Sequence, residues 1–484
     1  MAESDVSSSS PTFVHRFGEF ELDLARGRLF RAGVRVSLPD TQIAILVCLV
    51  AHAGQVVLKD TLVEAGWRGE TVTDDSLAQA VSRLRKALDS RGRGVTSFIE
   101  TVPGRGYRFT ACVERAERHD AGGGSVVNLR PYRAVIQGRA ALHTLNREGL
   151  RRARAAFEEA LRFDRDYVPA RIGLANACAL IFEATRVDAV WDVETLAEAV
   201  HHARHASLLA PSSGEAWSTL AFALYLRGDT EESAVAAHRA IALEPDNWQH
   251  WLRLAFVSWG EDRIRAARHV LQLCPGLALA HWLIATVLIA RGAFDAALGV
   301  LHAGCAAQDA QLTMPGSFPG VGLHLLRGLV LGAQQQFDAA ADALTRELSA
   351  IDEGQMYARE CAANTWYTLG ALRRRQRCHV DAEHAFASAL QVAPGHLSAL
   401  AALGRPLPAV DSGHPRALDA ALAHAAGLVR SGRRVEAAHA YRDAVIGAPL
   451  PCAGWLLPVE PVIDAASHVD AWADVLTIVR RRAV

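Results

Sequence analysis

One face of a single amphipathic segment carries the residue types best suited to binding chemistry. Residues 74–89, DDSLAQAVSRLRKALD, carry leucine and valine at spacings of four, three and four, which makes one side of a helix apolar. This apolar stripe consists of Leu77, Val81, Leu84 and Leu88. The opposite side carries Gln79, Ser82, Arg83 and Lys86. Arginine can read guanine edges and glutamine adenine edges, whereas lysine neutralises phosphate. The pattern predicts a helix anchored in a core by one face and placed in the DNA major groove by the other.

The charge around this helix differs from that of the whole chain. Residues 76–110 contain seven positive and two negative side chains, a balance of +5, whereas the 484-residue chain has a formal net charge of -1. The alternative is that SRLRKALD is only a solvated helix face. However, residues 98–109, FIETVPGRGYRF, predict a β-hairpin with Arg105 at its tip. A basic helix followed by a basic hairpin favours nucleic-acid binding.

Short strands and two further helices are predicted to hold this helix in place. The alternation in FELDL, RLFRAG and VRVSL indicates three half-buried strands between residues 20 and 38. A first helix is expected to start at Pro39 and Asp40 and to end at Gly54. Its predicted inward residues are Ile43, Leu46, Val47 and Val50. VVL and KDTLVEAGW then predict a short strand and a second helix.

The order of these elements resembles the OmpR/PhoB-type winged helix-turn-helix over residues 13–112. The resemblance is carried by LPDTQIAIL, LVEAGW and SLAQAVSRLRKAL in the three helices and by FIETVPGRGYRF in the wing. It implies that the third helix enters the major groove and that a wing arginine reaches the minor groove. Carried over by position, the groove candidates are Ser76, Gln79, Arg83 and Lys86, with Arg105 on the wing.

Three positions depart from the usual pattern of this family. Pro103 stands where many relatives have arginine, and Arg105 where they have a small residue, so the wing contact is shifted by two positions. Asp75 is acidic where relatives are often basic, so no phosphate contact is expected there. Tyr107 is expected to pack inside the wing rather than to stack on a base.

The second part of the chain repeats a pattern of about 34 residues. Residues 216–246 and 365–395 align without gaps and resemble the tetratricopeptide repeat. The signature positions are Trp217, Leu220, Gly228, Ala240 and Pro245 in the first unit, and Trp366, Leu369, Gly370, Ala382, Phe386, Ala389 and Pro394 in the second. Small residues let paired helices approach, and large ones fill the space between units. Weaker copies bring the prediction to six to eight repeats in one all-α solenoid.

The predicted organisation is therefore multidomain and mainly α. It comprises an α+β winged helix at residues 13–112, a flexible linker at 113–129 containing Gly122–Gly124, and the tetratricopeptide-repeat solenoid at 130–484. Outward positions of the first helices are expected to line a concave groove for a protein or peptide partner. The architecture resembles regulators of the HilA and CadC types, although the CadC type carries a membrane span that this sequence lacks. RNA polymerase and other regulators are candidate partners, and a dimer on DNA is one arrangement that the resemblance allows.

No catalytic, cofactor or metal site is expected. His201 and His205 have an i, i+4 spacing that can hold a metal ion, but no third ligand lies nearby in the sequence. GVGLHLLRG and AGGGS lack the ending of a phosphate-binding loop, and no nucleophile elbow occurs. The eight cysteines are scattered without a CxxC pair.

Location and function follow from the same features. The longest apolar stretch, residues 277–290, is shorter than the roughly 20 residues of a membrane span. With no signal peptide, a cytoplasmic, nucleoid-associated protein is expected. There is no room before residue 13 for a phosphoacceptor domain, so control by phosphorylation of such a domain is not expected. Two hypotheses stay open: a sequence-specific transcription regulator whose repeats bind a partner or effector, and an interaction scaffold whose winged helix has become a protein-binding module.

Overall fold

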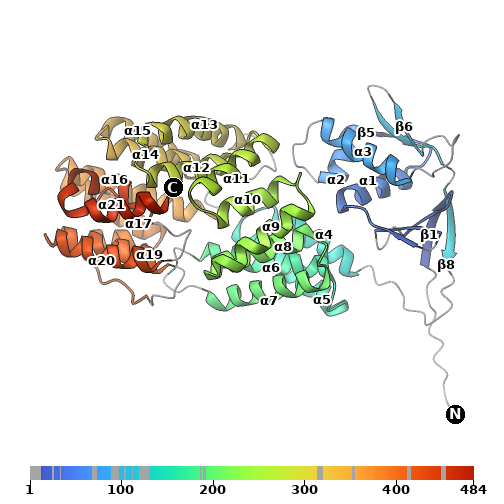
Figure 1. Cartoon of the computed structure of the whole chain (residues 1–484), viewed down its shortest axis with the longest axis horizontal. Helices are drawn as coiled ribbons and strands as arrows, with labels where there is room; N and C mark the ends of the chain where they lie inside the picture. The colour runs from blue at the N-terminus through green and yellow to red at the C-terminus, as the bar shows by residue number, and fades with distance from the viewer. Residues whose placement is uncertain are drawn as a thin grey trace, which may run out of the picture. The chain divides into compact units, whose positions relative to one another are not determined.

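The computed structural model divides the chain into two compact units, Met1–Arg133 and Ala134–Val484, which we describe separately (Figure 1). The residues that the structure describes are 12–23, 27–32, 34–67, 74–88, 98–102, 105–111, 113–118, 130–185, 188, 192–312, 320–351, 355–410, 416–448 and 454–484. Within these ranges, no helix is both long and apolar enough to cross a membrane. The predicted glycine linker, Gly122–Gly124, lies outside the described residues.

The first unit contains all the elements that the sequence predicts for a winged helix. They are β2 (Phe20–Asp23), β3 (Arg28–Arg31), β4 (Val34–Val36), α1 (Asp40–Ala51), β5 (Val56–Leu58), α2 (Lys59–Trp67), α3 (Asp74–Leu88), β6 (Ile99–Val102) and β7 (Gly106–Phe109). Two further strands, β1 (Thr12–Phe17) and β8 (Glu114–Arg118), were not expected. The strands form a sheet in the order β4-β3-β2-β1-β8 and a second sheet in the order β5-β7-β6.

The predicted start of the linker, residue 113, is wrong because β8 belongs to the first unit. β8 pairs antiparallel with β1 from Thr12 opposite Arg118 to Arg16 opposite Glu114. Its sequence, ERAER, lacks the apolar alternation of a half-buried strand, so only the pairing with β1 reveals it. The winged-helix unit therefore extends at least to residue 118.

Four phenylalanines connect the two sheets of the first unit. Phe17 lies 5.0 Å from Phe109 and 5.7 Å from Phe20, measured between ring centroids. Phe98 lies 5.8 Å from Phe17 and 6.0 Å from Phe20. These ring contacts fix the wing strands against the N-terminal sheet.

The inward face of α1 is displaced from the predicted one. Ile45 and Leu49 are fully buried, whereas Ile43 and Val47, which were predicted to be inward, are only half-buried. Ile43 lies at the rim of the core beside the turn at Gly27. Helical spacing predicted this helix correctly, but it assigned Ile43 and Val47 to the buried face, whereas the centre of that face lies at Ile45 and Leu49.

From Arg130 onward, the described residues form helices and two short 3-10 segments. The helices are α4 (Arg130–Leu142), α5 (Arg147–Phe163), α6 (Val168–Ala184), α7 (Val193–Leu209), α8 (Gly214–Arg227), α9 (Thr230–Leu243), α10 (Trp248–Val257), α11 (Gly260–Leu273), α12 (Ala278–Ala290), α13 (Phe294–Leu312), α14 (Leu323–Ala333), α15 (Phe337–Ala350), α16 (Ala358–Arg375), α17 (His379–Val392), α18 (Leu397–Ala402), α19 (Ala417–Arg430), α20 (Arg434–Gly447) and α21 (Val469–Arg482). The 3-10 segments are η1 (Leu457–Val459) and η2 (Ala465–Ser467). From α6 onward, successive helices pack as hairpins such as α8 with α9 and α16 with α17 (Figure 1).

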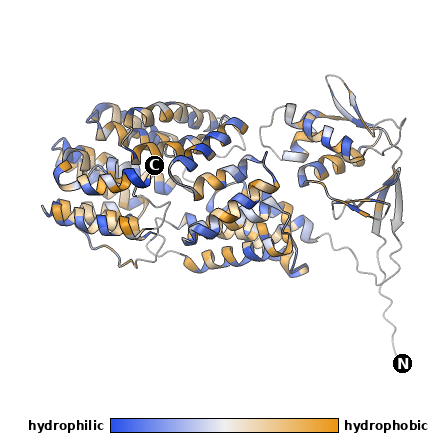
Figure 2. Ribbon diagram, viewed as in Figure 1, coloured by the Kyte–Doolittle hydropathy of each residue, from blue (hydrophilic) through white to orange (hydrophobic). Residues whose placement is uncertain are grey.

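These hairpins form the all-α tetratricopeptide-repeat solenoid that the sequence predicts. Gly228 adopts a left-handed conformation between α8 and α9, as its signature position requires. A Cβ atom at Gly370 would lie 2.8 Å from the ring of Phe386, so the glycine makes room for that ring. Ala382 and Ala389 are fully buried beside it. Hydrophilic and hydrophobic residues share the helices of this unit, as expected for packed repeats (Figure 2).

Residues far apart in the sequence of the repeat unit contact each other. The backbone N–H of Met356 donates to the carbonyl of Leu145 at 2.8 Å. Asp188 binds Arg147 at 3.0 Å and Arg359 at 2.9 Å, so one carboxylate links two distant parts of the chain. The first repeats are therefore fixed to the start of α16.

The C-terminal segment covers helices that were expected to line an open groove. Trp455 packs against Trp282 of α12 at 5.7 Å between ring centroids, and Val459 is buried in the same cluster as α12 and α14. At the end of the chain, Arg291 donates to the carbonyl of Ala483 at 2.8 Å. The prediction that first helices leave an outward face for a partner is therefore wrong for α12 and α14.

Candidate nucleic-acid interface

The candidate recognition helix, α3, is anchored by the apolar stripe that its sequence predicts. Leu77, Val81, Leu84 and Leu88 are each at most 1% exposed. They join residues of α1, α2 and the wing in one core. An α-helix turns by about 100° per residue, so this stripe fixes which side of α3 faces away from the core.

The predicted groove residues lie on that outer side. Gln79, Ser82, Arg83 and Lys86 are exposed, and their spacings of three and four residues place them on one face. Ser76 is half-buried one turn before Gln79. The structure thus brings these five residues together on a single helix face, with a hydrophobic anchor behind it.

A third side of α3 carries an arginine that holds the wing. The Nε of Arg85 donates to the carbonyl of Ile99 at 3.0 Å, and its Nη2 donates to the hydroxyl of Thr101 at 2.7 Å. Both acceptors lie on β6. The guanidinium also lies 5.8 Å from the ring centroid of Tyr107 on β7. Arg85 therefore connects α3 to both strands of the wing.

The wing itself is closed by tight packing at its base. A Cβ atom at Gly106 would lie 2.0 Å from the carbonyl oxygen of Val57, so the pairing of β7 with β5 requires glycine there. Tyr107 is 7% exposed, which confirms that it packs inside the wing. Arg105 is exposed at the turn between β6 and β7, whereas Pro103 lies outside the described residues.

The positive charges near α3 have different roles. Arg85 is committed to the wing, and Arg108 pairs with Glu100 across the hairpin at 3.7 Å. The remaining exposed cations of the described hairpin and helix are Arg83, Lys86 and Arg105. Among the described residues of this region, the exposed cations therefore lie on the outer face of α3 and on the wing turn, whereas Arg91 and Arg93 lie outside the described residues.

In the sequence, Arg85 is one of the local positive charges, and its contacts with the wing were not predicted. Its partners follow it by 14 and 16 residues, so helical spacing contains no sign of them. The one sign of this role in the sequence is that Arg85 belongs neither to the apolar stripe of α3 nor to its opposite polar face.

Comparison with known proteins identifies this unit. Residues 33–109 match the family described as "Transcriptional regulatory protein, C terminal". A solved structure, the DNA-binding domain of Escherichia coli CadC, is 31% identical and covers 22% of this chain and 98% of that chain, with a TM-score of 0.20. Residues 33–109 are a winged-helix domain of the OmpR/PhoB type.

Two curated transcription regulators are similar to part of this chain. The regulator HilA of Salmonella typhimurium is 37% identical over 106 residues, which cover 22% of this chain and 18% of HilA. The activator CadC of Escherichia coli K12 is 33% identical over 96 residues, which cover 20% of this chain and 19% of CadC. The chain thus matches less than a fifth of the length of these two regulators.

The two histidines with the spacing of metal ligands lie on one helix of the repeat unit. His201 and His205 lie on α7 with ring centroids 6.2 Å apart, and the Nε2 of His205 lies 3.4 Å from Asp166. Among the described residues, no group of three or more histidine, cysteine, aspartate or glutamate side chains could hold a metal ion.

Proposed function

We propose that this chain is a sequence-specific transcription regulator that binds promoter DNA through α3 and the wing. The observation that carries the proposal is the division of α3 into a buried leucine and valine stripe and an exposed face with Gln79, Arg83 and Lys86. A helix of this kind can enter the major groove while its apolar side stays in the core. The match of residues 33–109 to a family of transcriptional regulatory proteins supports the same function.

Each polar residue of this face has a distinct proposed role. Arg83, in the middle of α3, reads a guanine edge, and Gln79 reads an adenine edge one turn earlier. Ser76 and Ser82 donate to phosphate or to base edges at the two sides of this face. Lys86 neutralises a phosphate, and Arg105 adds affinity from the wing in or near the minor groove.

The repeat unit is proposed to bind a protein partner or an effector that controls transcription. Because α12 and α14 are covered by the C-terminal segment, we assign the contact to other surfaces of this unit. RNA polymerase and other regulators are candidates for the partner, and a dimer on DNA is one arrangement. Binding to promoters would place the chain on the nucleoid.

A gel-shift series with the full-length chain tests this function. Arg83→Ala is expected to lower the preference for target over random DNA by about 1–3 kcal/mol, because one bidentate base contact is lost. Arg105→Ala should weaken both kinds of binding similarly. Arg35→Ala, which removes an exposed cation from β4, is the matched control and should change neither. An unchanged specificity ratio for Arg83→Ala would contradict the proposed placement of α3.

A further inference from the structure

Exposed arginines lie where three neighbouring helices of the repeat unit end. Helix α16 ends at Arg375, α18 at Ala402 and α19 at Arg430. Four arginines at these ends, or in the turns that follow them, are exposed and form no ion pair within the described residues. We call them the arginine edge: Arg373, Arg377, Arg405 and Arg430. The tetratricopeptide signature does not require arginine at any of these positions.

Two contacts hold the three helix ends side by side. The Nη2 of Arg374 donates to the carbonyl of Ala402 at 3.0 Å, which joins the ends of α16 and α18. A Cβ atom at Gly404 would lie 2.6 Å from the Nη2 of Arg430, so the end of α19 packs against the turn after α18. Burial lowers the pKa of Arg374, and the positive charge of Arg430 adds to this effect while Glu383 opposes it. The arginine edge is therefore one continuous surface.

The guanidinium groups of the arginine edge have few partners inside the chain. Arg373 donates to the amide oxygen of Gln376 at 3.2 Å. In the part of the chain that the structure describes, the other three guanidinium groups make no hydrogen bond. Each guanidinium carries five N–H donors, so the edge offers many donors to an external acceptor.

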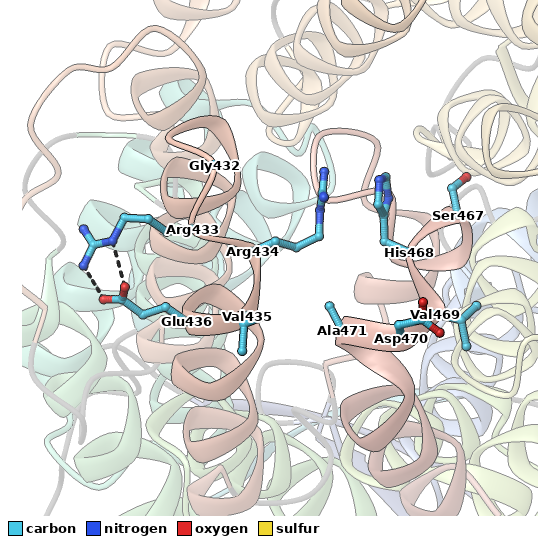
Figure 3. A pocket seen from close by; sticks show the side chains of 10 residues that line it. All are labelled: Gly432, Arg433, Arg434, Val435, Glu436, Ser467, His468, Val469, Asp470 and Ala471. Carbon is cyan, nitrogen blue, oxygen red and sulfur yellow. Dashed lines mark hydrogen bonds and ion pairs between the residues drawn. The ribbon is translucent and has the colours of Figure 1, made fainter.

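Nearby carboxylates are bound by arginines that do not belong to the edge. Glu436 accepts from the Nε and the Nη2 of Arg433, at 2.7 and 2.5 Å (Figure 3). Asp464 lies 3.2 Å from the Nη2 of Arg375. These pairs use the negative charge that stands closest to the three helix ends. The edge therefore keeps its positive charge.

The backbone of Arg377 is strained in a way that the fold does not require. Its φ is 65°, in the left-handed region that favours glycine. The corresponding turns after α8, α12 and α19 have Gly228, Gly292 and Gly432 at this position, each with a positive φ. Strain of this kind collects at functional sites. An arginine at this turn therefore points to a role outside folding.

The chemistry of the edge fits DNA better than it fits another protein. Protein interfaces have an apolar core enriched in aromatic residues, whereas interfaces with DNA are polar and strongly positive. The turn residues beside these arginines are polar or small: Gln376, Cys378, Gly404, Ser431 and Gly432. DNA is also the polyanion that the proposed function brings to this chain. Binding through α3 raises the local concentration of DNA at the repeat unit, because both units belong to one chain.

We propose that the arginine edge contacts the phosphate backbone of the DNA that α3 holds. The inference rests on the proposed function and extends the DNA interface from the winged helix to the repeat unit. Phosphate contacts of this kind add affinity and fix orientation, but they carry no sequence information. Substitutions in the edge should therefore weaken target and random DNA equally.

Fluorescence anisotropy with the full-length chain and a long random-sequence duplex, over a series of salt concentrations, tests this contact. Arg405→Gln combined with Arg430→Gln should lower the slope of log affinity against log salt by about 1.8, because each lost phosphate contact removes about 0.9. Arg239→Gln combined with Arg268→Gln is the matched control, because it removes two exposed arginines from α9 and α11 of the same unit. The control should keep the wild-type slope.

A second variant separates DNA binding from folding. Arg377→Gly relieves the left-handed strain, so the chain should unfold at a higher temperature than the wild type. The salt slope of this variant should nevertheless fall by about 0.9. Weaker binding by a more stable chain cannot result from misfolding.

Two results would overturn the proposal. An unchanged salt slope in the Arg405 and Arg430 double variant would do so, and would make an acidic protein the better occupant of this surface. An equal loss of slope in the Arg239 and Arg268 control would show that the contact is not located at the edge. Failure of the proposed function looks different, because it leaves the ratio of target to random binding unchanged in Arg83→Ala.

Discussion

Two adjacent cations of α3, Arg85 and Lys86, should respond to substitution in opposite ways. Arg85 makes two hydrogen bonds to β6 and contacts the ring of Tyr107, whereas Lys86 is exposed on the outer face. For Arg85→Ala we expect about 1–2 kcal/mol from the partly buried bond to Ile99 and about 1 kcal/mol from the exposed contacts. The free energy of unfolding should therefore fall by about 2–3 kcal/mol. Lys86→Ala should change it by less than about 0.5 kcal/mol, as surface substitutions usually do.

Denaturant unfolding of residues 1–133, the first compact unit, measures this difference. Trp67 is the single tryptophan of that fragment and reports its unfolding. The salt dependence of DNA binding provides the complementary measurement. Lys86→Ala should reduce the slope of log affinity against log salt by about 0.9, because one phosphate contact is lost. Equal stability losses in the two variants, or wild-type stability of Arg85→Ala, would refute the proposal that Arg85 holds the wing in place while Lys86 contacts DNA.

Three further outcomes follow from the structure. A fragment of residues 1–112 should be less stable than 1–133 by about 3–5 kcal/mol in denaturant unfolding, because β1 loses its ladder with β8; equal stability would mean that β8 is dispensable. Arg377→Gly should raise the thermal midpoint of the repeat unit, since Arg377 has a left-handed φ of 65° and relief of that strain is worth about 1 kcal/mol; a lowered midpoint would contradict this. Burial raises the pKa of Glu460 to about 7 from 4.5, so folding favours its protonated form and stability falls as pH rises between these values. Glu460→Gln should remove this decline, which amounts to about 3 kcal/mol, in urea midpoints measured at both ends of that range.

Local patterns predicted the buried and exposed faces of α3 correctly. The stripe from Leu77 to Leu88 could be derived because helical spacing decides which side chains enter the core. Its polar opposite face followed from the same geometry. The repeat hairpins could be predicted because glycine, alanine and aromatic positions recur with a fixed period.

Features that depend on distant partners could not be derived in this way. The strand state of β8 depends on pairing with β1, which lies about a hundred residues earlier. The closing contact between Met356 and Leu145 joins positions more than two hundred residues apart. No short-range periodicity encodes such contacts, so an open groove was predicted where the chain covers α12 and α14 itself.

Genome-wide mapping of chromatin bound by the full-length chain, in the cell that carries it, tests the central claim most directly. The account predicts a recurring sequence motif under the bound sites, located in promoters. The same experiment with Arg83→Ala should lose that motif at equal protein abundance, while Arg35→Ala should keep it. Binding sites without any shared motif, or a motif unchanged by Arg83→Ala, would contradict sequence recognition by α3. The first of these results would favour a scaffold whose winged helix binds protein.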